Sequence, residues 1–224
     1  MMVLSKQLLS AVLFLGFMCF KAVFAMTSPS LDEFPMFFNK QSLEKINRAS
    51  LPKPYDSLLT QPLMTTTLEK YYQRQAKIKV IYSQKNNKMN TYSRAILMLM
   101  DKDKTRNDVQ NAQTRKEDVV VELGLITMNF NELPQGVIHG VLHSDVPFGK
   151  LLLNHQVSVY STGQSYFRIN CTAKLRQLLA CKAKDKLYGR TNILMNKVSH
   201  RWLARVIEIL PLRRCVDRSC VVLN

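Results

Sequence analysis

Residues 119–130 read VVVELGLITMNF, an apolar and β-branched run that contains no proline. Such a run predicts a β-strand. Moving outward from it, the same signal recurs on both sides along the chain. The further predicted strands are Ile78–Tyr82, Tyr92–Met100, Val157–Ile169, Leu187–Met195 and Leu203–Leu210.

Helical patterns are interspersed among these strands. A helix is predicted from Leu63 to Arg74, where Thr65 to Thr67 can cap its start, and another from Leu133 to His143. We expect a short helix near Gln41–Arg48, a turn from Pro147 through FGKLLL, and a polar loop over Asp101–Lys116. The order predicts an α+β domain with a single antiparallel β-sheet and helices and flaps on one side of it.

The first 25 residues predict a cleavable signal peptide. Lys6 precedes an apolar run from Leu8 to Phe20, and the small residue Ala25 ends the segment. This order of charged, apolar and small residues is typical of secretion signals, and the run is short for a membrane anchor. We therefore divide the chain into a signal peptide (1–25), a leader (26–54), the main domain (55–212) and a tail (213–224), and expect a secreted or periplasmic protein.

The chain is strongly basic. Its formal net charge is +16, and the signal segment holds only two of the lysines. Such a charge favours anionic partners, whether nucleic acid, lipid headgroups, polysaccharide or small carboxylates, without selecting one. The basic residues are spread along the chain and form no nucleic-acid recognition motif, so specific nucleic-acid binding is not expected. An anionic surface stays open as a partner, and we expect a monomer.

Four cysteines remain after removal of the signal segment. An even number in an oxidising compartment predicts two disulfides. Of the three possible pairings we favour Cys171–Cys181, across the centre of a candidate hairpin, and Cys215–Cys220, in a short local loop.

No other chemistry-bearing motif is strong. His139 and His143 share one predicted helix face, but the sequence offers no evident third ligand, so we predict no metal site. The chain has no nucleophile motif of the GxSxG kind. We predict that it needs no cofactor.

Five segments occur in an order that resembles a known family. They are Leu58–Thr60 with Leu63–Glu69, Ser93–Leu97, Pro147–Leu152, Tyr188–Thr191 and Arg205–Pro211. Together they resemble the chorismate lyase family, including its divergent chorismate lyase-like branch, over roughly residues 55–212. The resemblance implies a sheet with helical flaps over a buried ligand, and conversion of chorismate to 4-hydroxybenzoate and pyruvate without cofactor or metal.

The resemblance also implies site residues. Arg94 matches the family's arginine that clamps the ring carboxylate, and Glu208 matches the glutamate that binds the far oxygen. Met64 and Phe148 match positions that supply main-chain contacts. A guanidinium suits a planar carboxylate, and Glu208 lies in the apolar run VIEIL, where a carboxylate is costly unless paired or used.

Other interpretations of these residues stay open. Arg94 and Glu208 could instead form a structural ion pair across the sheet, or Glu208 could point outward from an edge strand. Since chorismate is made in the cytosol, an exported chain also suits a non-catalytic module that only binds a small aromatic carboxylate, as related effector-sensing domains do. A third alternative is a basic secreted protein that binds anionic surfaces.

Overall fold

The structure is a computed structural model that describes residues 34, 37, 43–211, 213–216 and 219–222, the last two segments as backbone only. The predicted signal peptide and the first part of the predicted leader therefore lie outside the described residues. No helix in the described part of the chain has the length and apolar character needed to cross a membrane.

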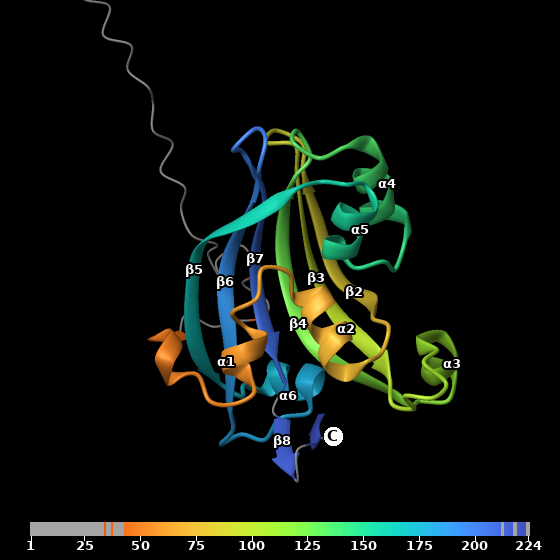
Figure 1. Ribbon diagram of the computed structural model, residues 1–224, viewed down its shortest axis with the longest axis vertical. Helices are drawn as coiled ribbons and strands as arrows, with labels where there is room; N and C mark the ends of the chain where they lie inside the picture. The colour runs from red at the N-terminus through yellow and green to blue at the C-terminus, as the bar shows by residue number, and fades with distance from the viewer. Residues whose placement is uncertain (1–33, 35–36, 38–42, 212, 217–218, 223–224) are drawn as a thin grey trace, which may run out of the picture.

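A seven-stranded sheet forms the centre of the molecule (Figure 1). Its strand order is β1-β5-β6-β7-β4-β3-β2, and every neighbouring pair is antiparallel. The strands are β1 (Leu43–Ile46), β2 (Lys77–Asn86), β3 (Thr91–Asp101), β4 (Asp118–Asn129), β5 (Val159–Asn170), β6 (Lys186–Asn196) and β7 (Trp202–Leu210). This confirms the predicted α+β class with one main antiparallel sheet.

Apolar residues cover both faces of the sheet. On β3, Arg94, Ile96 and Met98 lie on one face and Ala95, Leu97 and Leu99 lie on the other, because side chains alternate along a strand. Both sets are buried, so the inner strands are apolar over most of their length. We call the face that carries Ile96 and Met98 the first face.

Four helices cover the first face (Figure 1). They are α1 (Tyr55–Leu58), α2 (Met64–Tyr72), α4 (Gln135–His143) and α5 (Phe148–Asn154). Leu68 of α2 packs with Ile96 and Met98 of the sheet. Val141 of α4 packs with Ile126. The α4–α5 pair is tight, because a Cβ added to Gly140 would lie only 2.5 Å from the Leu151 side chain.

The prediction that the helices lie on one side is wrong for two of them. Leu175 and Leu179 of α6 (Ala173–Leu179) pack on the second face with Leu123 and Ile207. Val109 of α3 (Val109–Thr114) belongs to the same cluster. The second face is apolar as well, because it carries Leu97, Leu123, Leu125 and Ile207. Helices must therefore pack on this face too, to bury it from solvent.

Three local expectations need correction. The predicted helix near Gln41–Arg48 is wrong, because Leu43–Ile46 pairs with β5 as an edge strand and only a 3-10 turn, η2 (Arg48–Ser50), follows. The polar loop contains α3, which begins where the Asp108 side chain accepts hydrogen bonds from two backbone amides. The candidate hairpin at 171–186 contains α6, whose start is capped by Thr172.

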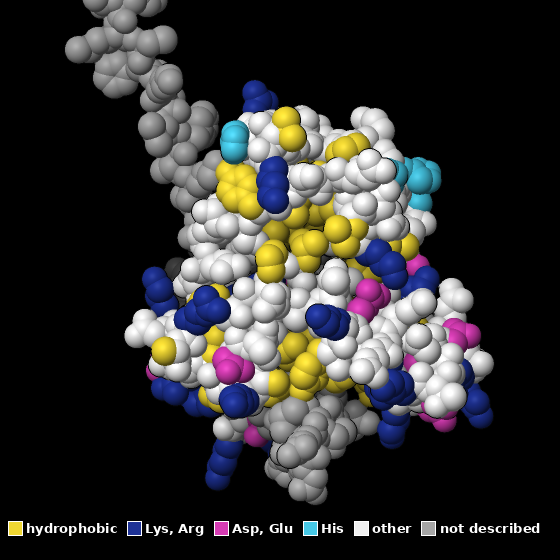
Figure 2. All heavy atoms as spheres, viewed as in Figure 1, with side chains coloured by type: hydrophobic (Ala, Val, Ile, Leu, Met, Phe, Trp, Pro, Cys, Tyr) yellow, Lys and Arg dark blue, Asp and Glu magenta, His cyan; other side chains and the backbone are white. Residues whose placement is uncertain are grey.

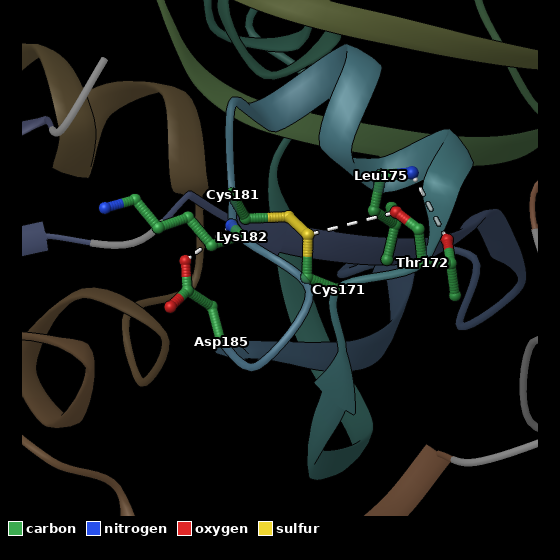
Figure 3. Close-up of a disulfide and its surroundings, with 6 residues drawn as sticks. All are labelled: Cys171, Thr172, Leu175, Cys181, Lys182 and Asp185. Atoms are coloured by element: carbon green, nitrogen blue, oxygen red, sulfur yellow. Dashed lines mark hydrogen bonds between the residues drawn. A yellow bond between two sulfur atoms is a disulfide. The ribbon is translucent and has the colours of Figure 1, made fainter.

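The predicted Cys171–Cys181 disulfide is present and joins the ends of the α6 segment (Figure 3). Both cysteines are buried in the cluster on the second face. The Lys182 amide donates to the Asp185 carboxylate in the turn that leads to β6 (Figure 3). The disulfide thus holds α6 against the sheet.

The C-terminal segment forms a separate two-stranded hairpin of β8 (Arg213–Val216) and β9 (Ser219–Val222). Its register sets Cys215 opposite Cys220. The side chains of this segment lie outside the described part of the chain, so the second disulfide stays a prediction.

Candidate ligand-binding cavity

A cavity of about 60 Å³ lies between the first face of the sheet and the helices above it. Its floor comes from β2, β3, β4, β6 and β7, and its roof comes from the starts of α2 and α5 with the residues before them. The lining residues are Pro62, Leu63, Met64, Thr65, Ile78, Arg94, Ile96, Met98, Glu122, Gly124, Ile126, Pro147, Phe148, Gly149, Asn192, Leu194, Val206 and Glu208.

The structure brings together all four residues that the sequence resemblance suggested. Arg94 of β3 and Glu208 of β7 lie on the floor, while Met64 and Phe148 lie in the roof. Met64 and Phe148 are each the first residue of a helix, α2 and α5. The backbone N–H of such a residue has no partner within its helix. Their roles in binding stay predictions.

Arg94 is a buried cation with few partners. Only 1% of its surface is exposed. Its Nη1 donates to the Val141 carbonyl in the last turn of α4, at 3.0 Å, while its Nε has no hydrogen-bond partner. No carboxylate in the described part of the chain lies within ion-pair distance of its guanidinium. Burial lowers the pKa of Arg94 to about 10.

Glu208 has a different partner from the one that sequence reasoning considered. Its carboxylate accepts a hydrogen bond from Arg190 Nε, and the two residues form a buried ion pair. Arg190 also donates to the Leu59 carbonyl at 2.8 Å and to the Gln61 carbonyl. An Arg94–Glu208 ion pair is therefore absent from the described structure, and β7 is an inner strand and not an edge.

Sequence reasoning missed Glu122. This residue lies on β4, is only 3% exposed and lines the cavity. Burial raises the pKa of its carboxyl, and the nearby Glu208 charge raises it further, while Arg190 acts in the opposite direction. The signal was visible, because Glu122 interrupts the apolar run VVVELGLITMNF just as Glu208 interrupts VIEIL.

Asn192 is a second missed residue on the cavity floor. Its Nδ2 donates to Ser161 Oγ at 3.2 Å, while its Oδ1 is buried without a hydrogen-bond partner. Asn192 lies in the same cross-strand row as Arg94, through Ile126 and Val206. The cavity floor thus carries several polar groups whose hydrogen-bonding capacity the protein itself does not fill.

The roof is formed where α2 and α5 meet. Gly149 of α5 lies beside Thr65 of α2, where an added Cβ would come 3.4 Å from Thr65 Oγ1, an ordinary contact distance. Lys150 and Glu69 form an ion pair of 3.4 Å between the same two helices. Thr65 and Gly149 of this seam line the roof of the cavity.

An open groove of about 650 Å³ adjoins the roof. It is lined by residues of α1, α2 and the loop between them, with Leu153 of α5, and it shares Pro62 and Leu63 with the buried cavity. Figure 2 shows apolar side chains gathered in the middle of this face of the molecule, with Lys and Arg side chains around them. The Pro62–Leu63 segment therefore lies between the cavity under the roof and the open groove.

His139 and His143 lie side by side on α4, with ring centroids 4.7 Å apart. No group of three or more potential metal ligands occurs among the residues that the structure describes.

The sequence matches no known protein-family profile. It also matches no curated protein. Solved structures with a similar course of the chain include PhnF from Mycobacterium smegmatis, with 7% identity, coverage of 68% of this chain and 65% of that chain, and a TM-score of 0.47. The effector domain of the same protein has 8% identity, coverage of 67% and 88%, and a TM-score of 0.45.

A further similar structure is a ligand-binding domain from Bordetella bronchiseptica assigned to a GntR-family transcriptional regulator. It has 8% identity, coverage of 66% of this chain and 90% of that chain, and a TM-score of 0.43.

Proposed function

We propose that the protein is a non-catalytic binding module for a small aromatic carboxylate, which Arg94 holds in the cavity. The proposal rests on the burial of the Arg94 side chain and on its lack of a carboxylate partner in the described structure. Its guanidinium is almost fully buried, lines a cavity, and has one hydrogen bond and no carboxylate partner in the described structure. A buried charge is costly unless it is paired, and an anionic ligand would supply the pair.

The chemistry of the cavity suits a carboxylate attached to an apolar group. A guanidinium presents a planar fork that matches the two oxygens of a carboxylate. The remaining lining is largely apolar, with Ile96, Ile126 and Val206 on the floor and Phe148 in the roof. The start of α2 carries no side-chain cap, and its backbone N–H groups favour negative charge nearby. These features suit an apolar ring or chain that ends in a carboxylate.

Binding without turnover is the form of the proposal that the geometry supports best. The resemblance assigns Glu208 to the far oxygen of the ligand, but one oxygen of its carboxylate is already bound by Arg190. Arg190 in turn holds two carbonyls of the α1–α2 loop. Glu208 is thus part of the framework of the site, and chorismate lyase activity is the rival to be tested.

We further propose that the protein acts outside the cytoplasm after removal of residues 1–25. Two features support this. The N-terminal segment has the order of charged, apolar and small residues found in secretion signals. The Cys171–Cys181 disulfide suits an oxidising compartment.

Calorimetric titration of the protein lacking residues 1–25 tests the binding role. Benzoate and 4-hydroxybenzoate serve as probes, and Arg94→Met serves as the key variant. Loss of a buried charge-assisted pair should cost about 2–4 kcal/mol, or about 30- to 1,000-fold in affinity. Arg168→Met is the matched control, since Arg168 pairs with Glu44 at the exposed edge of the sheet.

Two outcomes contradict the proposal. If the wild-type protein binds neither acid at millimolar concentration, the cavity does not serve small aromatic carboxylates. If incubation with chorismate releases 4-hydroxybenzoate in an Arg94-dependent manner, the protein is an enzyme and the non-catalytic role is wrong.

A further inference from the structure

The Glu122 side chain lines the cavity, and other protein groups do not use its full hydrogen-bonding capacity. Its Oε2 is buried without a hydrogen-bond partner. Its Oε1 leans over Gly124, because a Cβ added to Gly124 would lie 3.3 Å from that oxygen. Glycine at position 124 therefore leaves room for the carboxyl beside the cavity floor.

The strand register places Glu122 and Arg94 at opposite ends of the cavity floor. Arg94 lies opposite Ile126 of β4, whereas Glu122 lies opposite Met98 of β3. Glu122 and Ile126 are four positions apart on β4, so the two rows lie about 13 Å apart along the strand. Since the Glu122 carboxyl leans back over Gly124, the span to the Arg94 row falls to about 7 Å. A ligand that contacts both groups must therefore extend along the floor, from the Arg94 row to the Gly124 row.

The charged groups around Glu122 make its ionisation unfavourable. The Glu208 carboxylate on β7 repels a second negative charge. Arg190 on β6 attracts it, but Arg190 already binds Glu208 and two backbone carbonyls. Arg94 lies at the other end of the floor, and the roof contributes only uncharged side chains to the lining. Burial itself is the largest effect and also favours the neutral carboxyl.

We propose, on the basis of the carboxylate-binding role above, that Glu122 is protonated in the binding-competent protein and donates a hydrogen bond to the far end of the ligand. The ligand then carries a carboxylate at one end and a hydrogen-bond acceptor, a carbonyl or hydroxyl oxygen, at the other. A protonated Glu122 also leaves Arg94 as the one unbalanced charge among the described residues of the lining, so the ligand is a monoanion.

Two para-substituted benzoates distinguish a donating Glu122 from an accepting one. The para carbonyl of 4-formylbenzoate only accepts hydrogen bonds, whereas the para amino group of 4-aminobenzoate mainly donates them. A protonated Glu122 should favour the formyl compound, by about tenfold for one hydrogen bond. An ionised Glu122 should favour the amino compound.

The experiment is a calorimetric titration of both compounds, with benzoate as reference, from about pH 5.5 to about pH 8.5, where all three are carboxylates. The affinity of wild-type protein for 4-formylbenzoate should fall toward high pH. Glu122→Gln keeps a donor that cannot ionise, so its affinity should stay high and lose this pH dependence. Glu122→Leu should bind 4-formylbenzoate no better than benzoate.

The outcomes separate the two proposals. Arg94-dependent binding of benzoate, with equal affinities for the formyl and amino compounds at every pH, would overturn the role of Glu122 and leave carboxylate binding intact. A preference for 4-aminobenzoate would also overturn it. No binding of any of the three acids would overturn both proposals.

Discussion

Arg190 and Glu208 lie opposite each other on β6 and β7 and form a buried ion pair. This pairing neutralises the glutamate and anchors the α1–α2 loop through the Leu59 and Gln61 carbonyls. It leaves Arg94 as a cation without a carboxylate partner in the described structure. The arginine that anchors the framework of the cavity, Arg190, is therefore not the arginine that we propose as its binding group, Arg94.

Arg190→Met should strongly destabilise the fold. The change leaves Glu208 as a buried unpaired carboxylate and removes the donor to two loop carbonyls. We expect a loss of about 3–5 kcal/mol in the free energy of unfolding, measured by urea denaturation. Arg168→Met, which breaks a solvent-exposed pair with Glu44, should change the free energy of unfolding far less. Similar losses for both variants would contradict the framework role of Arg190.

Arg94→Met should behave in the opposite way. Arg94 is buried without a carboxylate partner, and burial lowers its pKa to about 10. Its charge therefore destabilises the fold of the ligand-free protein. Replacement by an apolar side chain of similar length should leave the melting temperature unchanged or raise it. A large fall in melting temperature would show that Arg94 serves the fold and not a ligand.

The stability of the ligand-free protein should depend on pH through Glu122. The pKa of Glu122 is raised in the folded state. Glu122 therefore stabilises the fold fully at pH values below its pKa in the unfolded chain, about 4.3, and this stabilisation is lost as the pH rises through its pKa in the folded protein. Urea denaturation across this range should therefore show wild-type stability falling relative to Glu122→Gln.

Glu44→Gln provides a control of opposite sign. The Arg168 hydrogen bond lowers the pKa of Glu44, so this group stabilises the fold above its unfolded pKa and loses that effect as pH falls. A wild-type protein whose stability parallels that of Glu122→Gln at every pH would show that Glu122 has an ordinary pKa.

Strands β2 to β7 were predictable, whereas helices α1, α3 and α6 and strands β1, β8 and β9 were not, and α5 was expected only as a turn. Continuous apolar runs marked β3, β4 and β7, because both faces of these strands are buried. Short elements carry weaker signals. In α6, Thr172 caps the helix and Leu175 and Leu179 share one face, but the hairpin interpretation of the two cysteines concealed this pattern. β1 is set by pairing with β5, a contact that local sequence does not encode.

The site was predictable in part. The ordered motifs pointed to Arg94, Glu208, Met64 and Phe148, and the structure gathers these four around one cavity. The partner of Glu208 was not predictable, because cross-strand register decides that Arg190 and not Arg94 lies beside it. Glu122 carried the same signal as Glu208, a carboxylate inside an apolar strand, but no motif drew attention to it.

The protein without residues 1–25, and so without Cys19, should contain no free thiol when it is purified from an oxidising compartment. Cys171 and Cys181 are bonded, and the predicted Cys215–Cys220 bond would use the remaining two cysteines. Each short loop should add about 2–3 kcal/mol to stability. Thiol labelling of the denatured, unreduced protein checks this, with a fully reduced sample as control. Two reactive thiols per chain would rule out one of the bonds.

The most direct test of the central claim observes the Arg94 side chain itself. In the NMR spectrum of protein labelled with ¹⁵N-arginine, the Nε–H signal that disappears in Arg94→Met is assigned to Arg94. The Arg94 Nε has no hydrogen-bond partner in the ligand-free structure. On titration with benzoate or 4-hydroxybenzoate, this signal should move in a saturable manner, because the carboxylate accepts its hydrogen bond. If it stays fixed while the acid binds and other arginine signals move, Arg94 is not the binding group of the cavity.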